Sequence, residues 1–161
     1  MKNVLVSLAL ALAVAGCMSY PPSVPEGYAG PVAKVEDSSV LYGVRRVDVF
    51  YMSHIDGRRI YGSLTYTRGT SSGLTPMTGD VLDRQITAEE HIVTIGARVV
   101  YSMGIMELYS PVYEVLGDVA FLPEPDKRYV VTGELGEGYS AVWIEDKKTK
   151  EIVTKKIVMR N

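Results

Sequence analysis

Apolar and polar residues alternate along most of the chain from Val32 onward, and a period of two residues predicts β-strands. The clearest alternating set, over residues 47–55, ends at Asp56-Gly57. This dipeptide favours a tight hairpin because both of its residues tolerate a positive φ. We therefore expect a return strand over residues 60–65 and then a loop over residues 67–79, which is rich in Gly, Ser and Thr.

Further alternating segments cover residues 81–87, 91–101, 113–121, 129–134, 139–144 and 152–158. The segment 91–101 is apolar on both of its faces, which predicts a central strand. We find no convincing helical periodicity outside the amino-terminal residues. Short strands joined by turns predict an all-β fold, and we expect a single antiparallel β-sandwich of the immunoglobulin-like type rather than a barrel.

The amino-terminal residues have the layout of a secretory signal peptide. Lys2 supplies a positive charge, residues 4–15 form an apolar run, and Gly16 follows as a small residue. The run is too short for a comfortable transmembrane helix, which needs about 20 residues. These features predict a signal peptide over residues 1–16.

The four residues Val14-Ala15-Gly16-Cys17 resemble the lipobox of bacterial lipoproteins at every position. The resemblance implies cleavage after Gly16, attachment of diacylglyceryl to the sulfur of Cys17, and usually acylation of the new amino terminus. Two or more acyl chains hold a protein stably at a membrane, whereas one chain binds only marginally. Met18 stands where an Asp would retain a lipoprotein in the inner membrane, so the resemblance favours an outer-membrane protein that faces the periplasm.

Four prolines and two glycines fall between Cys17 and Val32, which predicts an extended, flexible tether over residues 17–31. The β-sandwich is then expected over residues 32–161. Tyr20 and Tyr28 lie in the tether, where they could contact either lipid headgroups or the domain.

Four short motifs follow one another along the chain in an order similar to that of the motifs in small uncharacterised bacterial lipoproteins. Those lipoproteins carry a surface-anchored sandwich of the PEGA or immunoglobulin-like type. The motifs are Ile55-Asp56-Gly57-Arg58, Glu90-His91-Ile92-Val93, Arg128-Tyr129-Val130-Val131 and Val142-Trp143-Ile144-Glu145-Asp146. The chain departs from this pattern at Glu89, where glycine would be expected. The resemblance concerns strands and turns and carries over no catalytic residue.

Composition argues against several classes of function. The formal charge is −2 at pH 7, which argues against a nucleic-acid-binding protein, because such a protein needs a basic face. Cys17 is the only cysteine, so an intrachain disulfide is impossible, and the thioether would leave no free thiol. We find no motif typical of a hydrolase, a zinc protease or a redox enzyme, and no cofactor or metal is expected.

The two histidines provide the alternative to a non-catalytic protein. If His54 and His91 met in space with Asp56, Glu89 or Glu90, they could bind zinc. The more ordinary interpretation places each histidine at a strand end or on the surface.

Two other features also admit two interpretations. The carboxy-terminal lysines could bind anionic headgroups, or they could simply block edge-to-edge pairing of strands; they are Lys147, Lys148, Lys150, Lys155 and Lys156. Trp143 is expected to be a core residue rather than a platform for a ligand.

The sequence therefore predicts a non-enzymatic lipoprotein whose β-sandwich contacts another component of the cell envelope. A periplasmic metal-binding protein or enzyme that uses His54 and His91 is one alternative. A carrier of small ligands is the other, and it would need an apolar cavity of about 300 Å³ or more.

Overall fold

The computed structural model describes residues 20–70 and 76–160. Its strands are β1 (Val32–Glu36), β2 (Ser38–Tyr42), β3 (Arg46–Ile55), β4 (Arg58–Arg59), β5 (Asp83–Thr87), β6 (His91–Tyr101), β7 (Glu114–Phe121), β8 (Arg128–Gly136), β9 (Tyr139–Asp146) and β10 (Ile157–Met159). The helix α2 (Ser63–Thr70) and the 3₁₀ helix η1 (Gly104–Leu108) complete the elements. The first of these elements begins at Val32.

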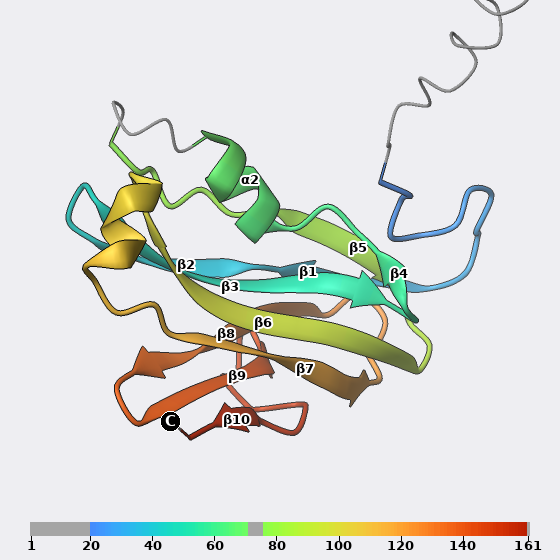
Figure 1. Ribbon diagram of the computed structural model, residues 1–161. Coiled ribbons are helices and arrows are strands. Elements are labelled where there is room, and N and C mark those ends of the chain that lie inside the picture. The colour runs from blue at the N-terminus through green and yellow to red at the C-terminus, as the bar shows by residue number, and fades with distance from the viewer. Residues whose placement is uncertain (1–19, 71–75, 161) are drawn as a thin grey trace, which may run out of the picture.

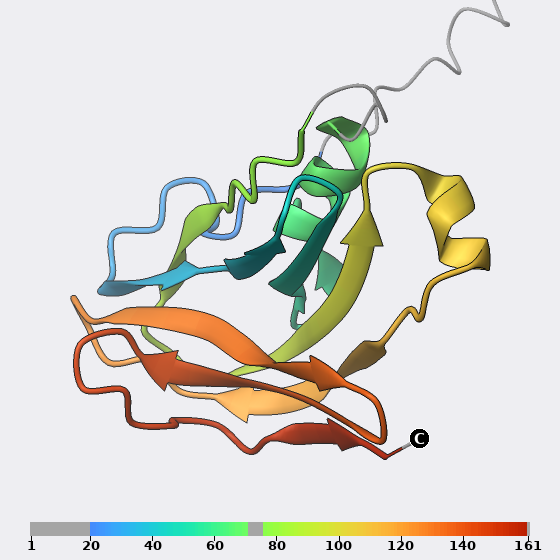
Figure 2. The ribbon, with the colours of Figure 1, turned by 90° about the vertical axis from the view of Figure 1, so that its left-hand side faces the viewer.

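The strands form two packed sheets, which confirms the predicted all-β sandwich (Figures 1 and 2). In the first sheet the order is β10-β9-β8-β1-β5, and in the second it is β2-β3-β6-β7, with β4 beside β3. The strands pair in an antiparallel manner except for β1 and β8, which are parallel. Only Asp37 separates β1 from β2, so the chain passes from one sheet to the other at this residue.

The space between the sheets is filled by apolar side chains. Val35 and Ile86 of the first sheet and Val93 and Ile95 of the second are completely buried there. A carrier that bound its ligand between the sheets would have to displace this core. Trp143 is also buried, but Val142 and Ile144 on either side of it face the core. Because side chains alternate along a strand, Trp143 lies on the outer face of the first sheet, with Lys156 Nζ 3.9 Å from its ring centroid.

The Asp56-Gly57 hairpin is confirmed, with φ values of 51° and 74°. The return strand predicted over residues 60–65 is wrong: the returning strand β4 covers only Arg58–Arg59, and the chain turns into α2 at Ser63. Residues 67–70, predicted as the start of a loop, therefore belong to this helix. The sequence of this helix is rich in threonine and contains glycine, so its own helix propensity is low. Its stability comes from tertiary contacts: Leu64 packs on a second apolar cluster, on the outer face of the second sheet, that includes Val47 and Val49.

The buried carboxylate of Asp37 holds the start of α2 and joins it to both sheets. Asp37 Oδ1 accepts hydrogen bonds from the Met52 amide (3.0 Å) and from Arg84 Nη1 (2.9 Å). Its Oδ2 accepts hydrogen bonds from the Ser63 amide (3.0 Å) and from Arg84 Nη2 (2.7 Å). Asp37 is only 1% exposed. The hydroxyl of Ser63, the residue whose amide Asp37 binds, accepts a hydrogen bond from the Leu82 amide at 2.8 Å.

The predicted last strand is too long. β10 covers only Ile157–Met159, whereas Ile152 forms a single isolated bridge with Glu145. Between them, the Thr154 hydroxyl accepts a hydrogen bond from the Ile144 amide at 3.0 Å. A side chain thus takes the place of the backbone acceptor that a continued strand would have offered.

Candidate functional surfaces

Gly16 and Cys17 lie outside the described residues, so the structure begins three residues after the predicted lipid site. Tyr20, the first described residue, rests against the domain: its ring centroid is 5.2 Å from that of Tyr61. The Arg59 guanidinium lies over the Tyr20 ring at 5.6 Å. Further along, the Tyr28 hydroxyl lies 3.4 Å from Glu89 Oε1. The tyrosines of the predicted tether therefore both contact the domain.

The two histidines lie on opposite faces of the second sheet. His91 is opposite the core residue Phe121, whereas His54 is opposite Thr94, three residues further along β6. Side chains three residues apart on one strand point to opposite faces of the sheet, and directly paired residues on neighbouring strands point to the same face. The sheet therefore lies between the two imidazole rings. Among residues 20–70 and 76–160, no group of three His, Cys, Asp or Glu side chains could hold a metal ion.

The structure does bring His91 and Asp56 together. His91 Nδ1 lies 2.7 Å from Asp56 Oδ2, and His91 Nε2 lies 2.8 Å from the Thr87 hydroxyl. This order of hydroxyl, imidazole and carboxylate is that of a catalytic triad. However, Thr87 is 5% exposed and His91 is 8% exposed, so a substrate could not reach the hydroxyl without opening the fold. The chain of hydrogen bonds instead joins the β5–β6 turn to the β3–β4 turn.

The contact with His91 also changes the acidity of Asp56. Burial raises the pKa of the Asp56 carboxyl, but the hydrogen bonds from His91 and from the Ile92 amide outweigh it, so the pKa lies below its ordinary value. A carboxyl whose folded-state pKa is lowered stabilises the fold above its unfolded pKa of about 3.9. This stabilisation is lost as the pH falls through the folded-state value.

We expect Asp56→Asn to lower the free energy of unfolding at pH 7 by about 1 kcal/mol, since the half-exposed carboxylate is screened by water. The difference from the unsubstituted protein should shrink below about pH 4. Urea unfolding at several pH values measures it. Asp126→Asn is the matched control, because Asp126 is also a turn residue with a positive φ. An Asp56→Asn deficit that does not change with pH would contradict the role of the ionised carboxylate.

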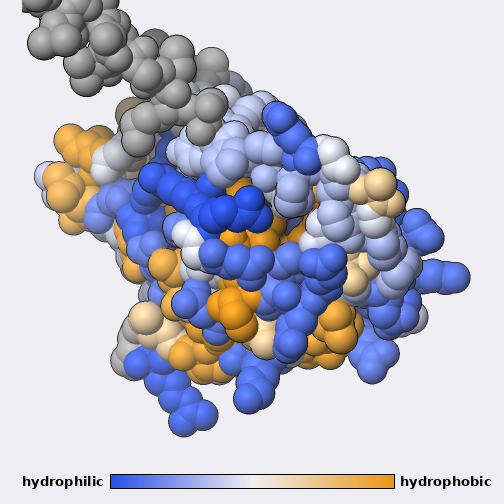
Figure 3. Space-filling model, turned by 90° about the vertical axis from the view of Figure 1, so that its right-hand side faces the viewer, coloured by the Kyte–Doolittle hydropathy of each residue, from blue (hydrophilic) through white to orange (hydrophobic). Residues whose placement is uncertain are grey.

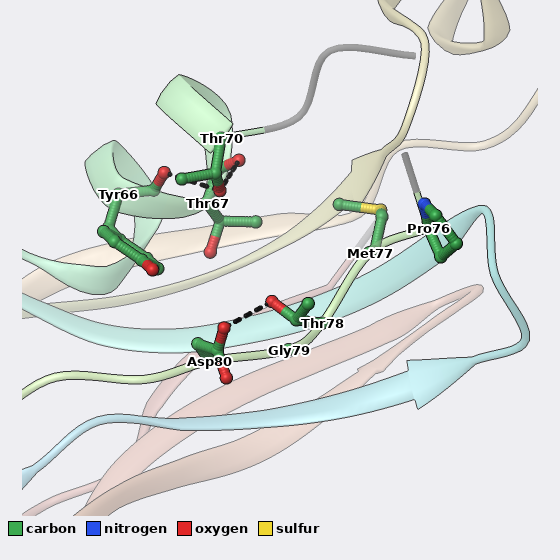
Figure 4. Close-up of a pocket in the computed structure, with 8 residues that line it drawn as sticks. All are labelled: Tyr66, Thr67, Thr70, Pro76, Met77, Thr78, Gly79 and Asp80. Carbon is green, nitrogen blue, oxygen red and sulfur yellow. Dashed lines mark hydrogen bonds between the residues drawn. The ribbon is translucent and has the colours of Figure 1, made fainter. Parts of the chain in front are cut away.

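The described surface carries several open depressions. A small pocket of about 120 Å³ lies between α2 and the segment that follows it, and it is lined by Tyr66, Thr67, Thr70, Pro76, Met77, Thr78, Gly79 and Asp80 (Figure 4). Within it the Thr78 hydroxyl donates a hydrogen bond to Asp80 at 2.6 Å. A second depression, of about 270 Å³, includes His54, Tyr51 and Arg59. Burial is the main cause that raises the pKa of the Tyr51 hydroxyl to about 12, so this group is a neutral hydrogen-bonding group at physiological pH.

The predicted lysine patch carries both signs of charge. An open depression of about 600 Å³ is lined by Lys127, Arg128, Lys147 and Lys148 together with Asp126, Asp146 and Thr149. Lys147 pairs with Glu36, and Lys127 pairs with Glu124 at 2.7 Å. Lys150 pairs with Glu145 at 3.2 Å. Because carboxylates neutralise these lysines, the depression is a weak candidate for binding an anionic polymer.

One end of the sandwich exposes large apolar side chains. They belong to the β2–β3 turn and to the segment around η1, which lie at the same end in Figures 1 and 2. We call this set the distal apolar end; it consists of Tyr42, Val44, Met103, Ile105, Leu108 and Tyr109. Leu108 is 76% exposed and Tyr109 is 84% exposed. Single exposed apolar residues are common, but a group of them is typical of an interaction surface.

Polar contacts fix the two segments that carry these side chains. The Ser102 amide donates a hydrogen bond to the Arg45 carbonyl at 2.9 Å, which links the segment before η1 to the β2–β3 turn. Arg46 lies over the Tyr42 ring at 4.5 Å and pairs with the buried Asp48. On the η1 side, Arg98 pairs with Glu107 at 3.2 Å. The apolar side chains are therefore presented on segments that are held in place.

The distal apolar end was not predicted from the sequence, because residues 102–112 show neither strand nor helix periodicity. Comparison of the chain with protein-family models, with curated proteins and with solved structures gave no significant match. No helix within residues 20–70 or 76–160 is long and apolar enough to cross a membrane.

Proposed function

We propose that this chain is a lipoprotein of the bacterial cell envelope whose β-sandwich binds another envelope protein through the distal apolar end. The observation that carries the proposal is the exposure of six large apolar side chains on segments held in place by hydrogen bonds and ion pairs. The lipid is proposed from the lipobox-like residues before and at Cys17. The role is one of binding, and no catalytic step is assigned to it.

The position of this end favours a protein as its partner. β3 runs from Arg46, beside the distal apolar end, to Ile55, beside the hairpin that leads to Arg59 and Tyr61. Its ten residues span roughly 30 Å at ~3.3 Å per residue. Tyr20 lies against Tyr61, so the described part of the chain begins at the opposite end (Figure 1). A bilayer that holds Cys17 would leave the distal apolar end free for a protein.

Capture of the partner tests this proposal. The native lipidated protein should recover one envelope protein reproducibly from solubilised membranes, and Leu108→Ser with Tyr109→Ser should lower the recovery by about 30-fold or more. This figure corresponds to the loss of about 2 kcal/mol, which is typical of one central interface residue. The matched control is Lys34→Ser, an exposed position on the outer face of the first sheet. Recovery that is the same with and without the distal substitutions would contradict the proposed surface.

A further inference from the structure

We infer that the opposite end of the sandwich is a membrane-contacting surface, in which Tyr20, Arg59 and Tyr61 lie on phospholipid headgroups. We call these three residues the anchor-proximal surface. The inference rests on the proposed lipidation of Cys17 and gives the domain a defined orientation at the bilayer.

The length of the intervening chain sets the distance from the lipid. Cys17 precedes Tyr20 by three residues, which span at most about 11 Å when fully extended. The headgroup layer on each side of a bilayer is about 5–8 Å thick. With its acyl chains in the hydrocarbon core, Cys17 would lie at the boundary between that core and the headgroup layer. Tyr20 would then lie within the layer or just above it.

The contacts of Tyr20 bring two other residues to the same depth. Tyr61 is 43% exposed and packs against the Tyr20 ring at a tilt of 58°. The Arg59 guanidinium also lies over the Tyr20 ring, 5.6 Å from its centroid. Tyrosine is enriched at membrane interfaces because its ring is apolar and its hydroxyl is polar. An arginine guanidinium binds phosphate oxygens through two parallel hydrogen bonds.

The charge around these residues suits a zwitterionic or mildly anionic headgroup. Tyr20 and Tyr61 border a shallow depression of about 290 Å³ that also contains Asp83 and Arg84. Asp37 neutralises Arg84, whereas Asp83 is exposed at the depression and Arg59 lies over the Tyr20 ring that borders it. Figure 3 shows this end of the molecule, where hydrophilic side chains cover most of the surface and apolar ones lie between them. The surface would therefore contact headgroups without entering the hydrocarbon core.

Fluorescence quenching on vesicles tests this orientation with the full lipidated protein. Because lipid blocks Cys17, a newly introduced cysteine would be the only free thiol to label. Ser23→Cys places a probe in the depression beside Tyr20, and Ser110→Cys places the matched probe next to Tyr109 at the distal end. Both serines are half-buried. The vesicles contain phosphatidylethanolamine, phosphatidylglycerol and a lipid with a nitroxide on its headgroup.

We expect the probe at position 23 to be quenched several-fold more than the probe at position 110. Tyr61→Ala with Arg59→Gln should reduce this difference, as should the milder Arg59→Gln alone, while Lys34→Ser, at an exposed position away from both probes, should leave it unchanged. Flotation of the same vesicles reports lipidation independently. Equal quenching of the two probes on protein that floats would overturn the inference and leave the proposed lipoprotein intact. Protein that does not float would remove the proposed lipidation, and the inference with it.

Discussion

Replacing Asp37 with alanine is expected to lower the free energy of unfolding by about 3–5 kcal/mol, which is the usual effect of removing one partner of a buried ion pair. Arg84 has a side-chain exposure of only 7%, so its charge would stay buried without the carboxylate. The amides of Met52 and Ser63 would lose their acceptor as well. Since Asp37 joins β3, α2 and β5 at the crossing between the sheets, we expect the whole domain to be affected.

Urea unfolding of the mature chain, followed by Trp143 fluorescence, measures this effect. Asp83→Ala is the matched control, since Asp83 is an exposed aspartate next to Arg84 and its loss should change the free energy by no more than about 0.5 kcal/mol. If Asp37→Ala costs less than about 1 kcal/mol, the buried guanidinium and the two amides must find other acceptors, and Asp37 does not hold the sheets together as argued above.

Replacing Cys17 with serine is expected to abolish incorporation of fatty acid and to leave the precursor uncleaved. A serine hydroxyl offers no thiol for the thioether, and cleavage of a lipoprotein precursor follows that modification. Each buried methylene of an acyl chain stabilises membrane binding by about 0.8 kcal/mol, so losing two or three chains removes the stable attachment. Labelling of growing cells with radioactive palmitate, together with the electrophoretic mobility of the protein, gives the result.

Ser19→Ala provides the control for this substitution, because it changes a neighbouring residue and leaves Val14-Ala15-Gly16-Cys17 intact. Its labelling and mobility should match those of the unsubstituted protein. Palmitate that remains on the Cys17→Ser protein would place the lipid on another residue and would contradict the resemblance to a lipobox.

The local rules of alternation and turn chemistry predicted much of the fold. The apolar faces of β3 and β6 and the Asp56-Gly57 hairpin depend on neighbouring residues, and they were found where the pattern put them. Helix α2 could not be predicted in this way. Its first amide is bound by Asp37, which lies 26 residues earlier, and a short segment with weak helix propensity carries no sign of such a partner.

The candidate surfaces were harder to predict because each depends on distant parts of the chain. The exposure of Leu108 and Tyr109 depends on which elements leave that end of the sandwich uncovered. The separation of His54 from His91 depends on the register between β3 and β6. The contact between Tyr20 and Tyr61 joins residues that are 41 positions apart. The sequence could therefore not decide whether Tyr20 contacts lipid headgroups or the domain.

The lipid on Cys17 is the claim on which the location, the orientation and the membrane contact all depend. Mass spectrometry of the amino-terminal peptide, taken from protein purified out of native membranes, tests it most directly. We expect a peptide that begins at Cys17 and carries the added mass of a diacylglyceryl group, with a further acyl chain on its amino group. A peptide that begins elsewhere, or a Cys17 thiol without any added mass, would contradict it.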